Sequence, residues 1–214
     1  MELDLREGFV EPELAEEFPD LGLVHTTVEA RPARSPPELR ARLRRLADRY
    51  TGGRVVHMRQ DAVPWAYRVF WRQVGIDPDK DRTPAERVAV ERLQHGGFRS
   101  DNTVDDALTI AVAETGVGLV AFDGDLVGVT LGLRLARSGE WLEKERPLPP
   151  RQIVIADERR ALAVLVGEVA RSAGVTSRSR RVELAGLRVK GVPKIAVEEA
   201  LWLAAEVLMA PAGA

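Results

Sequence analysis

The sequence predicts an α+β fold in one compact domain, with a mixed, curved sheet in the second half of the chain packed by helices. Apolar residues recur with helical spacing over most of the first half. After residue 118, short apolar runs alternate with turn residues, as in strands. No proline- or glycine-rich linker divides the two halves, so we expect them to share one core.

The first half is expected to form one strand and four helices, over residues 23–30, 36–50, 62–74, 84–95 and 103–115. Ser35 is the predicted N-cap of the first helix, and two prolines follow it. Thr83 and Glu86 form a capping box at the start of the third helix. We assign residues 1–60 to a strand and helix segment that covers the same domain, whose main part is residues 61–210.

The second half is expected to contain five short strands, over residues 119–122, 127–136, 152–156, 161–166 and 181–187. Pro193 then opens a final amphipathic helix. Its predicted buried side consists of Ile195, Val197, Ala200, Leu201, Ala204 and Leu208.

Composition excludes several classes of protein. The chain has no cysteine, which excludes thiol catalysis and cysteine-ligated zinc, and its three histidines have no metal-ligand spacing. We therefore expect no metal and no cofactor. The net charge of −2 means that any nucleic-acid contact must use a local basic patch, and we expect no DNA partner. The charged N-terminus and the short apolar runs predict a cytoplasmic protein without a membrane partner, and they leave the oligomeric state open.

Three groups of residues, in a fixed order, make the chain similar to a known family. The first is Tyr67-Arg68 followed by residues 75–80, and the second is the capping box with Glu91-Arg92. The third runs from Arg99 to Asp123. This order resembles the editing domain of the phenylalanyl-tRNA synthetase beta subunit, and more closely the free-standing proteins that carry this domain. The resemblance covers residues 67–208 and implies a mixed α/β fold with a curved sheet around a small pocket.

The resemblance also implies site residues. The family's polar and glycine positions around the pocket helix fall on Arg99, Asn102, Asp106, Glu114, Gly116 and the Ala121-Phe122-Asp123 strand end. Its Thr-Asn pair falls on Leu108 and Thr109, its histidine on Val120, and its last-strand glutamate near Ala185, two residues from Glu183. The substrate-binding positions are therefore Arg99, Asn102, Asp106, Thr109, Glu114, Val120 and Asp123.

The same residues also have ordinary structural interpretations. Asn102 and Asp106 suit the start of a helix, where they would cap it and complement its dipole. Asp123 begins a turn, where aspartate bonds to nearby backbone. No catalytic residue is identified; the candidates for positioning water in an ester hydrolysis are Thr109, Asp106 and Glu183.

Two basic clusters complete the prediction. Five arginines lie within residues 40–49, and a serine-rich run next to the last strand supplies the predicted RNA-binding residues Arg178, Arg180, Arg181, Arg188 and Lys190. The leading hypothesis is a stand-alone domain that binds tRNA or an aminoacyl-tRNA end. The alternatives are a trans-editing hydrolase of mischarged tRNA with altered catalytic residues, and an amino-acid or small-molecule binding protein that does not bind RNA.

Overall fold

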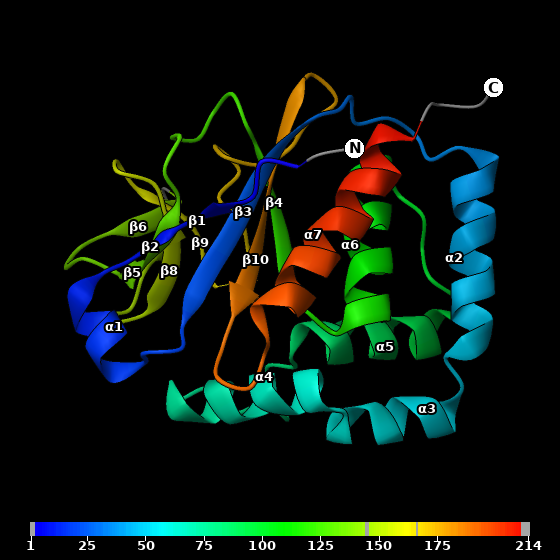
Figure 1. Ribbon diagram of the computed structural model, residues 1–214, viewed down its shortest axis with the longest axis horizontal. Helices are drawn as coiled ribbons and strands as arrows, with labels where there is room; N and C mark the ends of the chain where they lie inside the picture. The colour runs from blue at the N-terminus through cyan, green and yellow to red at the C-terminus, as the bar shows by residue number, and fades with distance from the viewer. Residues whose placement is uncertain (1–2, 144–145, 166, 211–214) are drawn as a thin grey trace.

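Two four-stranded sheets, a two-stranded ribbon and seven α-helices make up the computed structural model over its described residues 3–143, 146–165 and 167–210 (Figure 1). The strands are β1 (Arg6–Glu7), β2 (Phe9–Val10), β3 (Gly22–Glu29), β4 (Leu119–Asp123), β5 (Gly132–Leu135), β6 (Trp141–Glu143), β7 (Arg146–Pro147), β8 (Ile153–Ala156), β9 (Ala161–Ala163) and β10 (Arg181–Arg188). The helices are α1 (Pro12–Glu17), α2 (Pro37–Arg49), α3 (Gly52–His57), the 3₁₀ turn η1 (Met58–Gln60), α4 (Ala62–Gln73), α5 (Pro84–His95), α6 (Thr103–Thr115) and α7 (Lys194–Met209). The predicted α+β class is confirmed.

The first sheet has the strand order β1-β3-β10-β4, and every neighbouring pair is antiparallel. Its two longest strands are β3 and β10, and β3 is an interior strand. In the second sheet, of order β2-β5-β8-β9, β2 runs parallel to β5 and the other pairs are antiparallel. The first half of the chain therefore contributes strands to both sheets, whereas the sequence pattern indicated one sheet built in the second half.

Helices α6 and α7 lie side by side and cover one face of the first sheet (Figure 1). Helix α7 packs on β3 and β10, while α2 and α5 pack on α6. Gly186 in β10 permits this close approach, because a Cβ atom there would lie 2.7 Å from Val197 Cγ1 in α7. Side chains three residues apart in a strand point to opposite faces of the sheet. The side chain of Glu183 therefore lies on the face away from α7.

The predicted starts of α5 and α6 are confirmed, because local hydrogen bonds fix both of them. The Thr83 capping box is complete, and Asn102 Oδ1 accepts the backbone N–H groups of Val104 and Asp105. The prediction that Ser35 is the N-cap of α2 is wrong. The N-cap residue is Pro36, and Ser35 Oγ is buried without a hydrogen bond to any described residue. Serine one residue before the cap is too far from the free N–H groups of the first turn to bond them.

Other boundaries differ from the sequence pattern. The strand expected over residues 127–136 is shortened to β5, because Gly128 donates its N–H to Asp157 Oδ2 instead of pairing with a strand. The strand expected over 161–166 ends at Ala163, and residue 166 lies outside the described residues. Ile195 was expected on the buried side of α7 but is 69% exposed. No helix within the described ranges has both the length and the apolar character needed to cross a bilayer.

Buried polar side chains join these elements. The Tyr67 hydroxyl donates to the carbonyl of Leu187 and accepts the Gly118 N–H at 3.0 Å, so it ties α4 to β10 and to the start of β4. Arg134 is 2% exposed and forms two hydrogen bonds of 2.6 and 2.7 Å with the Glu140 carboxylate. These bonds lower the pKa of Glu140 to about 2.

Candidate functional site

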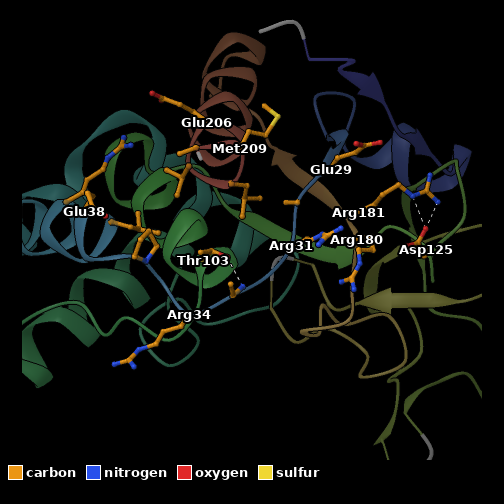
Figure 2. A pocket seen from close by; sticks show the side chains of 18 of the residues that line it. Glu29, Arg31, Arg34, Glu38, Thr103, Asp125, Arg180, Arg181, Glu206 and Met209 are labelled. Atoms are coloured by element: carbon orange, nitrogen blue, oxygen red, sulfur yellow. Dashed lines mark hydrogen bonds and ion pairs between the residues drawn. The ribbon is translucent and has the colours of Figure 1, made fainter. Parts of the chain in front are cut away.

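A cavity of about 1080 Å³ opens between α2, the C-terminal end of α7 and the start of β10 (Figure 2). The segment between β3 and α2 forms another wall. Thr103 at the start of α6 holds that segment in place: Thr103 N donates to Ala33 O at 3.0 Å, and Ala33 N donates to Thr103 Oγ1 at 3.2 Å. Prolines at positions 32, 36 and 37 restrict the same segment. These two hydrogen bonds and the prolines restrict the conformation of this wall.

Arginine is the most frequent charged residue in the cavity lining. The arginines that line it are Arg31, Arg34, Arg42, Arg45, Arg180 and Arg181. Arg181 pairs with Asp125 at 2.6 Å, and Arg180 donates to backbone carbonyls in its own turn. The side chains of the other four make no hydrogen bond or ion pair with any described residue. Four guanidinium groups are thus available to an anionic ligand.

Three glutamates whose side chains bond to none of the described residues line the same cavity. Glu29 ends β3, Glu38 lies in the first turn of α2 and Glu206 lies near the end of α7. Each is exposed, and none bonds to a described side chain. Figure 2 shows that they come from three different elements. The cavity thus combines free donors with free acceptors, with arginines in the majority.

The predicted RNA-binding residues lie in two separate places. Arg180 and Arg181 line the cavity, and Arg178 is in the turn before them. Arg188 and Lys190 lie at the other end of β10, roughly 24 Å away at the usual rise of a strand. There Arg188 Nε donates to Asp20 O at 3.3 Å. Only the first group is near the arginines of α2.

The polar residues before α6 mainly organise the start of that helix. Asn102 caps it, and the buried Asp106 carboxylate accepts Ser100 Oγ at 2.6 Å and the Asp101 N–H at 3.3 Å. Arg99 is exposed and bonds to His95 at 3.3 Å. None of the predicted substrate-binding residues lines the large cavity, whose lining takes only Thr103 from α6.

The remaining predicted substrate-binding residues are spread over α6 and β4. Glu114 pairs with Arg49 of α2 at 2.5 Å, and Thr109 is half-buried within α6. Asp123 is buried and accepts Ser179 Oγ at 2.5 Å. Val120 lies directly opposite Ala185 in the antiparallel pair β4–β10. The positions of the family's histidine and glutamate are thus cross-strand neighbours here, occupied by two apolar side chains.

Glu183 belongs to a buried polar cluster that the sequence pattern did not reveal. Its carboxylate bonds to His25 Nδ1 at 2.6 Å and to Arg6 Nη2 at 3.0 Å, and it accepts the Thr27 hydroxyl. His25 is 1% exposed and Glu183 is 4% exposed. The available signal was that His25 and Thr27 lie on one side of β3, opposite the side of Val24 and Val28. Their partner, however, is more than 150 residues away in sequence.

Comparisons with known proteins agree with this architecture. The B3/4 domain family model matches residues 66–207, close to the range expected from the sequence. The phenylalanine–tRNA ligase beta subunit of Cutibacterium acnes is 34% identical over 85 residues, which cover 38% of this chain and 10% of that protein. The beta subunit of Nitrosospira multiformis is 37% identical over 97 residues, 41% of this chain and 12% of the subunit. That of Methylococcus capsulatus is 35% identical over 131 residues, 58% of this chain and 16% of the subunit.

These alignments therefore cover less than a fifth of each relative's length, and they confirm the predicted resemblance to one region of the beta subunit. The chain belongs to the B3/4 domain family.

Proposed function

We propose that this chain binds RNA, with tRNA or an aminoacyl-tRNA end as the leading candidates, through the arginine-lined cavity. The observation that carries the proposal is a set of four arginines, Arg31, Arg34, Arg42 and Arg45, that line one cavity and whose side chains bond to none of the described residues. Guanidinium groups bind phosphate through paired hydrogen bonds, and phosphate contacts supply most of the affinity of RNA-binding proteins.

The relatives of this chain support RNA, rather than another polyanion, as the ligand. The relatives are named as ligases that act on a tRNA, and the shared region is a small part of each of them. The chain as a whole is weakly acidic, with a net charge of −2, so a general attraction for polyanions is not expected. Binding should therefore depend on the residues of the cavity.

The test is a titration of fluorescently labelled tRNA, followed by anisotropy at several salt concentrations from about 50 to 200 mM. Replacing Arg42 and Arg45 by alanine together should weaken binding and lower the slope of log K against log salt by about 0.7 to 0.9 per arginine. Arg44→Ala is the matched control, because Arg44 is exposed on the same helix but does not line the cavity. Absence of binding by the unmodified protein at the lowest salt would refute the proposal, and so would equal losses in the control.

Ester hydrolysis is the second candidate function, and one observation favours it. His25 of β3 and Glu183 of β10 form an imidazole–carboxylate pair, and β10 is the strand on which the family's glutamate position falls. Such a pair can accept a proton from water. Both side chains are buried, however, so water and substrate would need an opening that this conformation does not provide. Burial therefore favours binding over hydrolysis.

Incubation with a panel of mischarged tRNAs tests the hydrolytic function. If the pair is catalytic, deacylation should exceed that in buffer, and Glu183→Gln should abolish the excess while tRNA binding is kept. Rates equal to buffer for every amino acid in the panel would exclude hydrolysis and leave the binding function standing.

A further inference from the structure

The carboxylates of the cavity pose a problem that phosphate binding alone does not solve. Glu29, Glu38 and Glu206 would repel a phosphate, yet they line the same cavity as the four arginines whose side chains have no partner among the described residues. Ion pairs between exposed side chains contribute little to stability, so these groups need not pair with one another. Here neither set pairs with the other among the described residues. The arrangement leaves acceptors as well as donors for a ligand.

A carboxylate only accepts hydrogen bonds, so its partner in the ligand must be a donor. The ribose 2′-hydroxyl is such a donor, it lies within a few ångströms of the phosphates in RNA, and DNA lacks it. A cavity lined by arginines and glutamates therefore matches the alternating phosphates and hydroxyls of a ribose–phosphate backbone. This match would distinguish RNA from DNA without contact to a base.

The uncharged part of the cavity lining indicates whether the bases of an RNA could stack there. It is aliphatic, with Leu39 from α2 and Leu208 and Met209 from α7, and no aromatic side chain of the described chain lines the cavity. Proteins that bind single strands usually stack the free bases on aromatic rings. A cavity without rings suits RNA whose bases are already paired, since a duplex presents its backbone and the 2′-hydroxyls of its wide, shallow minor groove.

We propose that the cavity recognises the backbone of double-helical RNA, with the arginines binding phosphates and Glu38 and Glu206 accepting hydrogen bonds from 2′-hydroxyls. This inference rests on the RNA binding proposed above and adds the class of RNA and the basis on which DNA is excluded.

The test compares three labelled probes at one salt concentration: a blunt RNA duplex, the DNA duplex of the same sequence, and one RNA strand alone. The RNA duplex should bind most tightly, with a preference over the DNA duplex of about tenfold or more for each hydrogen bond from a 2′-hydroxyl to a charged acceptor. Glu38→Ala combined with Glu206→Ala should bring the RNA-to-DNA affinity ratio toward one without weakening the binding of DNA, because two negative charges are removed.

Glu199→Ala is the matched control, since Glu199 is exposed on α7 outside the cavity, and circular dichroism checks that each variant is folded. If no probe binds the unmodified protein, the RNA-binding proposal itself fails. If RNA binds but the single strand binds most tightly, or the double variant keeps the full RNA-to-DNA ratio, the inference about the ribose backbone is overturned while RNA binding stands.

Discussion

Replacing Glu183 by alanine should destabilise the protein strongly, because this carboxylate is the centre of a buried polar cluster. Arg6, His25 and Thr27 all bond to it, and each would lose that partner. The cluster also links three strands of the first sheet, since Arg6 lies in β1, His25 and Thr27 in β3, and Glu183 in β10. The substitution therefore affects the pairing of the sheet as well as one side chain.

The magnitude follows from the burial of the cluster. Removing one partner of a buried ion pair costs about 3 to 5 kcal/mol, because the remaining charge stays desolvated. A domain of this size has a total stability of about 5 to 15 kcal/mol, so the loss is about a fifth of it or more. At about 2 to 4 °C per kcal/mol, the melting temperature should fall by roughly 6 to 20 °C.

Urea denaturation followed by circular dichroism measures this loss. Glu13→Ala is the control: Glu13 pairs with Arg151 at 2.5 Å, but both side chains are more than 60% exposed. The control should lose less than about 1 kcal/mol, as exposed ion pairs do. If the two variants lose similar amounts, burial is not what makes the Glu183 cluster stabilising, and the reasoning is wrong.

Three further predictions concern stability. Tyr67→Phe should cost about 1 to 3 kcal/mol in urea denaturation, because the buried Gly118 N–H loses its acceptor; a cost below about 0.5 kcal/mol would contradict this. Gly186→Ala should cost about 1 to 3 kcal/mol by overpacking against α7, and an unchanged melting temperature would show that the contact relaxes freely. Because the bonds from Arg134 hold the pKa of Glu140 at about 2, against 4.5 unfolded, this carboxylate stabilises the fold above pH 4.5. That stability should be lost as the pH falls toward 2. Between pH 4.5 and 2, the urea midpoint of Glu140→Gln should therefore fall less steeply than that of the unmodified protein. If the two midpoints fall in parallel, the ion pair does not lower the pKa of Glu140 as stated.

The features that were predicted best from the sequence are those that depend on short-range hydrogen bonds. The capping box at Thr83 and the Asn102 cap involve groups three residues apart or fewer, so the residue pattern alone determines them. The periodicity of α4, α5 and α6 was equally visible. Helices as short as α1 and α3 were missed, because six residues give too few turns for a period to be recognised.

The site was less predictable, because it depends on which segments meet. Both basic clusters were visible in the sequence, but nothing local indicates that Arg45 of α2 and Arg180 before β10 line one cavity. The interior position of β3 was missed for the same reason. Strand pairing between distant segments follows from tertiary packing, and periodicity reports only which face of a strand is apolar.

The pairing of β3 with β10 also affects how the chain can fold. Thr27 and Glu183, which are paired in the sheet, are 156 residues apart in sequence. At synthesis rates of about 5 to 20 residues per second, β3 leaves the ribosome roughly 8 to 30 s before its main partner. During that interval β3 can pair only with β1, which leaves one of its edges open to other chains. The central sheet therefore forms late, and its slow, non-local closure makes this interval the stage of synthesis at which the chain is most prone to aggregate.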